Sequence, residues 1–137
     1  MKTKTMIATA LLTAGLGIGA VGTTANAASW HKGTPSALRG KWKTKPWTQS
    51  GYKYDYRSFI SAHKIISEVR GLNGGPSDMA APTVQHARYK YLGNHLYKFK
   101  GTSLGTSPSS CYIKWKSHNH IVIKPWSNNK VFSYYRY

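Results

Sequence analysis

The fold is decided by the stretch Leu38-Arg39-Gly40-Lys41-Trp42-Lys43-Thr44, a short basic segment in which a glycine precedes a tryptophan by two residues. Small or apolar residues alternate here with cations, and this period of two is typical of a half-buried β-strand. One face carries Gly40, Trp42 and Thr44, and the other carries Arg39, Lys41 and Lys43. We therefore expect a first strand over 39–45, ended by Pro46, with Trp42 pointing inward.

Seven further segments alternate in the same way or are rich in β-branched and aromatic residues. They are 52–60, 63–70, 83–92, 95–100, 110–116, 120–124 and 130–137. Glycine, proline, serine and asparagine gather between them, most of all in the breaks 71–82 and 101–109. None of these segments has a sustained apolar stripe of helical period. The sequence therefore predicts an all-β fold, a small antiparallel up-and-down barrel of about eight strands.

Closure of such a barrel requires the first and last strands to meet. Arg136 lies in the last predicted strand and shares a face with Phe132 and Tyr134, so it can approach Trp42. A guanidinium stacked over an indole gains roughly 0.5 to 2 kcal/mol. The alternative is that Trp42 is an ordinary core residue and Arg136 a surface charge.

The first 27 residues have the three parts of a secretory signal peptide. Lys2 and Lys4 precede an apolar stretch over 6–21, and Ala25-Asn26-Ala27 is a small-x-small cleavage site. The apolar stretch is interrupted by threonines and glycines and is shorter than the roughly 20 residues of a membrane span. We expect export, no membrane span, and a single secreted domain over 28–137 that is extracellular or associated with the cell wall.

Charge is the strongest compositional signal. Without Lys2 and Lys4 the chain keeps 18 lysines and arginines against three carboxylates, a formal charge of +15. Such a field attracts polyanions and repels cations. A surface that serves only solubility mixes charges of both signs, and this sequence hardly does.

Two resemblances are carried by the opening of the domain. Trp30-His31-Lys32-Gly33-Thr34-Pro35, followed by 38–42, resembles the start of small secreted proteins of uncharacterised function from lactobacilli. Gly40-x-Trp42 resembles the first-strand signature of the lipocalin/calycin superfamily. That resemblance implies that Trp42 closes the barrel floor under a cation from the last strand, a position that Arg136 matches. It also implies a carrier of a small apolar ligand.

Residues for catalysis or metal binding are sparse. The only carboxylates are Asp55, Glu68 and Asp78, and the first two fall on separate strands among cations, where ion pairing is expected. Cys111 is the only cysteine, which excludes an internal disulfide, and we expect it to be buried. The His118-Asn119-His120 motif has the spacing of a partial metal site but is better explained as a turn. We expect no enzymatic activity, no cofactor and no metal.

Rings and cations interleave in three segments: 88–91, 97–100 and 112–116. On strands, this pattern predicts rings on the inner face and cations outside. With the first strand, these segments supply the candidate polyanion-binding residues. They are Arg39, Lys41, Lys43, Arg88, Lys90, Lys98, Lys100, Lys114 and Lys116.

Two functions remain open from the sequence. The first is a basic, non-enzymatic barrel, expected to be a monomer, that binds anionic cell-envelope polymers such as teichoic acids by surface electrostatics. Nucleic acid would bind by the same physics, but only in vitro. The second is a lipocalin-like carrier of a small apolar ligand in the barrel interior. An eight-stranded barrel can be filled by side chains or left open for one ligand, so the interior distinguishes the two functions.

Overall fold

The computed structural model describes residues 29–125 and 130–137. The predicted signal peptide 1–27 lies outside the described residues, as does 126–129 in the last predicted turn. No helix in the described ranges is long and apolar enough to cross a membrane.

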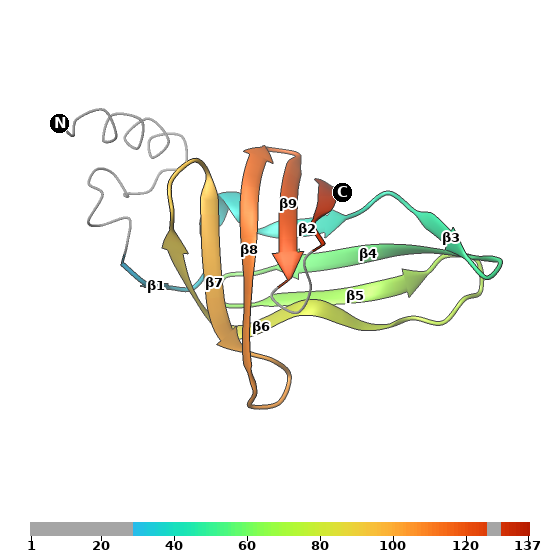
Figure 1. Ribbon diagram of the computed structural model, residues 1–137, viewed down its shortest axis with the longest axis horizontal. Coiled ribbons are helices and arrows are strands. Elements are labelled where there is room, and N and C mark those ends of the chain that lie inside the picture. Colours follow the sequence, from blue (N-terminus) through green and yellow to red (C-terminus); the bar gives the residue numbers. More distant parts are fainter. Residues whose placement is uncertain (1–28, 126–129) are drawn as a thin grey trace.

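The described chain is an antiparallel sheet that closes into an eight-stranded barrel (Figure 1). The strands are β1 (His31–Lys32), β2 (Gly40–Lys43), β3 (Trp47–Gln49), β4 (Tyr52–Ile60), β5 (Ile65–Gly71), β6 (Asp78–Tyr91), β7 (Leu96–Thr102), β8 (Pro108–Ser117), β9 (His120–Pro125) and β10 (Phe132–Arg136). A single 3-10 turn, η1 (Ser36–Leu38), precedes β2. Strands β2 and β4 to β10 form the barrel in chain order, and β10 pairs with β2 to close it. The predicted up-and-down barrel is therefore confirmed.

The predicted strands all exist, but the prediction missed part of the sheet. β6 begins at Asp78 rather than at residue 83, because Asp78 and Ala80 still pair with β5. Two short edge strands were also missed: β1 pairs with β6, and β3 pairs with β4. Strands of two or three residues are too short for alternation to be visible in the sequence.

Three barrel strands extend beyond the barrel. The outer ends of β4, β5 and β6 continue past the barrel as a twisted ribbon with β3 on its edge (Figure 1). We call this ribbon, β3 with the outer ends of β4, β5 and β6, the arm. The inner face of β4 in the arm is continuous with the inner face of the barrel.

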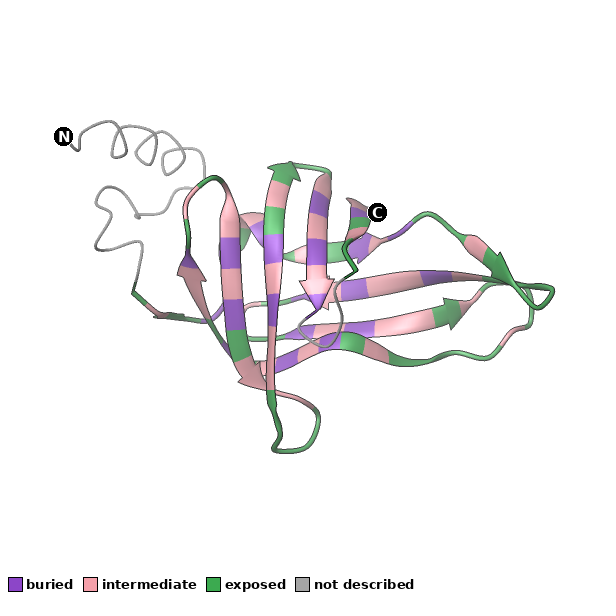
Figure 2. Ribbon diagram, viewed as in Figure 1, coloured by how far each residue is buried: buried purple, intermediate pink, exposed green. Residues whose placement is uncertain are grey.

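Side chains fill the barrel interior. Buried residues alternate with exposed and half-buried ones along the barrel strands (Figure 2). The largest fully buried side chains are Trp42, Tyr97, Tyr134, Phe99 and Leu38. Burial raises the pKa of the Tyr97 and Tyr134 hydroxyls, as expected where water is excluded. Aliphatic residues of β5, β6, β8 and β9 pack around these rings. The interior is therefore a packed core.

Trp42 and Arg136 are in contact, as the sequence predicted. The contact lies at the end of the barrel next to η1 and the β8–β9 turn, which we call the closed end. The Arg136 guanidinium carbon lies 4.2 Å from the centre of the Trp42 ring. Arg136 also donates hydrogen bonds to the carbonyls of His118, Arg39 and Ala37, at 2.8, 2.8 and 3.3 Å. The Trp42 indole N–H donates to the Leu38 carbonyl at 2.9 Å. One cation therefore satisfies three carbonyls while it covers the ring.

Gly40 is required by the same contact. Its φ is +138°, and a Cβ at this position would overlap the Arg136 guanidinium. A larger residue would therefore be strained and would push Arg136 away from Trp42. This explains physically why a glycine stands two residues before the tryptophan.

We predict that Trp42→Ala lowers the free energy of unfolding by about 3 to 5 kcal/mol, because it removes a large, fully buried ring. Denaturant unfolding followed by circular dichroism measures the change. Trp30→Ala, which removes a half-buried ring from the outer surface, should cost clearly less. A loss below about 1 kcal/mol for Trp42→Ala would show that the ring is peripheral to stability.

Candidate functional site

The nine predicted polyanion-binding residues divide into two groups. Arg39, Lys41 and Lys43 precede or belong to β2, and the other six lie on the adjacent strands β6, β7 and β8. Strands β4 and β5 on one side and β9 and β10 on the other separate the groups. The residues therefore do not form one continuous surface.

The β2 group makes contacts within the protein. Arg39 donates hydrogen bonds to the Thr34 carbonyl at 2.6 Å and to its hydroxyl at 3.2 Å. The Lys43 ammonium lies 4.9 Å from the centre of the Tyr137 ring. These contacts give both residues a role in packing the outer layer.

Like charges face each other in the second group. Lys90 on β6 is directly opposite Lys98 on β7, and Arg88 is directly opposite Lys100. The row continues across the sheet, since Lys98 pairs with Tyr112 on β8 and Tyr112 with Lys124 on β9. We call this surface the basic patch and define it as Arg88, Lys90, Lys98, Lys100 and Lys124 with the rings of Trp30 and Tyr112.

Two aromatic rings separate these cations. The ammonium groups of Lys100 and Lys90 lie 4.1 and 4.8 Å from the centre of the Trp30 ring. Lys98 lies 5.6 Å from the centre of the Tyr112 ring. The cation–π contacts offset part of the repulsion between the lysines.

Neither ring was assigned to this surface from the sequence. Trp30 precedes the first predicted strand, and only the pairing of β1 with β6 brings it over the lysines. Tyr112 was expected on the inner face and the expectation was wrong. It has the same parity as Lys114, whereas Ile113 between them is buried.

Lys114 and Lys116 lie outside the basic patch. Both are exposed on β8 towards the closed end, and Lys114 faces Leu96 and Val122 across the sheet. They extend the positive surface without adding opposed charges to it.

The three carboxylates of the sequence are elsewhere. Asp55 and Glu68 lie on β4 and β5, and Asp78 begins β6 in the arm. Asp55 pairs with Arg57 at 3.0 Å and Glu68 pairs with Arg70 at 3.3 Å, which confirms the expected ion pairing. The hydrogen bond to Asp55 raises the pKa of Arg57 above its ordinary value.

The opposed cations of the basic patch therefore have no carboxylate partner among the three in the sequence. Like charges directly opposite each other in a sheet are destabilising, so the basic patch lowers the stability of the fold.

A bulge in β6 makes the edge of the basic patch concave. The register with β7 shifts between Gln85 and Arg88, and His86 takes a φ of +52°. Gly101 of β7 permits the close approach, because a Cβ there would overlap the Gln85 carbonyl. The result is a groove of about 420 Å³ lined by His86, Arg88, Lys100 and the start of β8. A second groove of about 410 Å³ shares His86 and adds His63 and Lys64.

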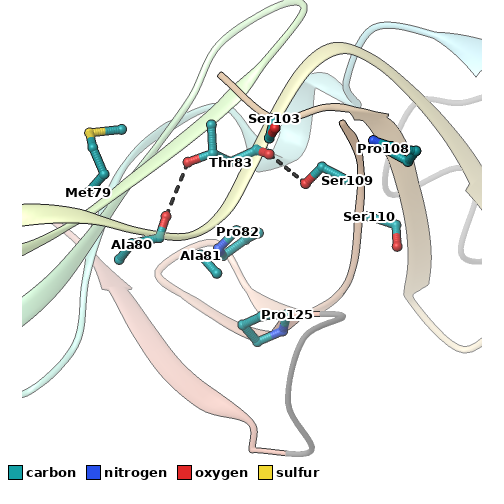
Figure 3. Close-up of a pocket in the computed structure, with 10 residues that line it drawn as sticks. All are labelled: Met79, Ala80, Ala81, Pro82, Thr83, Ser103, Pro108, Ser109, Ser110 and Pro125. Carbon is teal, nitrogen blue, oxygen red and sulfur yellow. Dashed lines mark hydrogen bonds between the residues drawn. The ribbon is translucent and has the colours of Figure 1, made fainter. Parts of the chain in front are cut away.

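A different pocket opens at the barrel mouth, between the starts of β6 and β8 and the end of β9 (Figure 3). Its volume is about 360 Å³, and its ten lining residues are alanine, proline, serine, threonine and Met79. Thr83 holds the wall together: its hydroxyl donates to the Ala80 carbonyl at 3.1 Å, and its carbonyl accepts from Ser109 at 2.6 Å. None of the lining residues is an acid, base or thiol, so this pocket lacks the groups for general acid–base catalysis.

The remaining sequence candidates have structural contacts. His118 lies in the turn between β8 and β9, as expected, while His120 stacks on Tyr135 at 4.7 Å between ring centres. In residues 29–125 and 130–137, no group of three or more histidine, cysteine or acidic residues could hold a metal ion. The chain has no significant match among protein-family models, curated proteins or solved structures.

Cys111 is buried in the core, as predicted, and burial raises the pKa of its thiol. Because the thiolate is the reactive form, we predict that Cys111 does not react with Ellman's reagent in the native protein. The same reagent should label it fully after unfolding in guanidinium chloride. Rapid native labelling would show that this part of the core opens readily.

Proposed function

We propose that this protein is a secreted, non-enzymatic β-barrel that binds anionic polymers of the cell envelope, of the teichoic-acid type, on the basic patch. The observation that carries the proposal is the two pairs of opposed like charges, Lys90 with Lys98 and Arg88 with Lys100. This arrangement costs stability in the free protein, and a bound polyanion would remove the cost. Export rests on the signal-peptide pattern of residues 1–27.

The spacing of these cations suits a polymer with repeated charges. Neighbouring strands are about 4.8 Å apart, and alternate residues on one strand are about 7 Å apart. The patch therefore offers a grid of positive charges with a groove at Arg88 and Lys100. Each phosphate that replaces counterions contributes a similar, salt-dependent increment, so affinity comes with little selectivity among phosphate polymers.

The packed interior disfavours the carrier function. A ligand inside the barrel would have to displace Trp42, Tyr97, Phe99 or Tyr134, all of which are fully buried. Such rings are costly to move because protein interiors are close-packed. The uncharged lining of the mouth pocket likewise offers no support for an enzyme.

We predict that Lys90→Gln/Lys98→Gln weakens retention on purified cell walls and reduces its salt dependence. Two lost phosphate contacts should lower the slope of log affinity against log salt by about two units. A matched control is Lys41→Gln/Lys53→Gln, which removes the same charge from exposed residues of β2 and β4. The control should lose much less, because those lysines lie outside the basic patch.

Two results would count against the proposal. Retention that is insensitive to salt and to removal of teichoic acid from the walls would refute the electrostatic mechanism. Equal losses for the two double variants would show that the overall charge binds and that the basic patch has no special role.

A further inference from the structure

A second surface, unlike the basic patch, lies on the inner face of the arm. Residues at alternate positions of β3 and β4 share this face. They are Trp47, Gln49, Tyr52, Tyr54 and Tyr56. Three of them, Trp47, Gln49 and Tyr56, line a groove of about 600 Å³ at the barrel mouth. The other lining residues are Thr44, Lys45, Lys130 and Phe132. We call it the aromatic groove. The sequence predicted alternation over 52–60 but not β3, so it did not predict the groove.

The rings form one continuous row from the arm to the mouth. The distances between ring centres are 6.5 Å from Tyr52 to Tyr54, 5.8 Å from Tyr54 to Trp47, and 4.7 Å from Trp47 to Tyr56. Phe132 follows Tyr56 at 5.1 Å. Tyr56 and Phe132 rest on the core, whereas Trp47 is half-buried and Tyr52 is 43% exposed. A contiguous row of partly exposed aromatic rings is therefore a candidate binding surface.

The backbone holds this groove in one shape. β3 and β4 are joined by the two-residue turn Ser50-Gly51, with φ values of +52° and +83°, as in the type I′ turns of tight hairpins. At the other end, the Thr44 hydroxyl accepts a hydrogen bond from the Tyr56 N–H at 3.0 Å, and the Thr44 N–H donates to the Tyr56 carbonyl at 3.0 Å. Trp47 is thus fixed on both sides, which reduces the entropy lost on binding.

We infer that the aromatic groove binds the sugar units of a glycan. Aromatic rings pack against the C–H faces of a pyranose, while Gln49 and Lys45 can hydrogen-bond its hydroxyl groups. An alkyl chain would bury the same polar groups without partners, which is unfavourable. Stacked nucleobases need exposed, roughly parallel platforms, but Trp47 and Tyr56 are tilted by 36° and Tyr56 and Phe132 by 67°. The row is long enough to contact more than one sugar.

This inference does not rest on the proposed function. The groove is built from the segment after β2 and from β3, β4 and the start of β10, whereas the cations of the basic patch lie on β6, β7 and β9. A neutral sugar contributes no counterion release, so its binding should be insensitive to salt, unlike polyanion binding.

The test uses a panel of neutral hexasaccharides of N-acetylglucosamine, glucose, mannose and galactose. Each is titrated into a protein comprising residues 28–137, and binding is followed by tryptophan fluorescence and by the heat of binding. We expect saturable binding of at least one member that is unchanged in high salt. Trp47→Ala should weaken it roughly tenfold or more, the effect of losing one stacked ring, and Trp47→Phe should largely restore it. Trp30→Ala and Lys90→Gln/Lys98→Gln should bind as the unmodified protein does.

The unfolding midpoint of each variant shows whether the protein stays folded. Gln49→Leu tests the site without removing a ring. It should weaken binding severalfold, because it removes a hydrogen-bonding group. The inference is overturned if no hexasaccharide binds, or if Trp47→Ala and Gln49→Leu both bind as tightly as the unmodified protein. Oligothymidylate and palmitate are titrated in the same way. The inference is also overturned if one of them binds in a Trp47-dependent way and no hexasaccharide does.

Discussion

The contact between Arg136 and Trp42 is the constraint on which the rest of the barrel depends. The two residues are direct partners in the β2–β10 pairing, so the contact joins the first barrel strand to the last. The guanidinium stacks on the indole and ties three carbonyls from the chain segments that end there. Closure removes the free edges that an open antiparallel sheet would leave exposed.

Closure around a filled core determines where binding can occur. Large rings occupy the interior, so the available surfaces are the outside of the barrel and its mouth. The outside offers opposed cations on β6 and β7, and the arm at the mouth offers a row of aromatic rings. The two surfaces have different chemistry: charge on one, ring stacking with hydrogen-bonding groups on the other. A polymer that carries both phosphates and sugars would match the pair.

Alternation in the sequence was enough to predict the eight barrel strands, because a half-buried strand must alternate. The Trp42–Arg136 contact followed from inward positions on the first and last strands. The basic patch could be predicted only as a set of cations, since the opposition of Lys90 to Lys98 depends on the register between β6 and β7. Trp30 and Trp47 were missed because two short edge strands, which show no periodicity, bring them to their surfaces.

The most direct test of the central claim, that the basic patch is a polyanion site, is a residue-by-residue map of binding. Backbone amide NMR shifts of a protein comprising residues 28–137 would be followed during titration with a short polyglycerol phosphate at moderate salt. The account predicts the largest shifts at Arg88, Lys90, Lys98, Lys100 and Tyr112, with small ones on β2 and β4. Shifts spread evenly over all basic strands, or concentrated on β2, would contradict it.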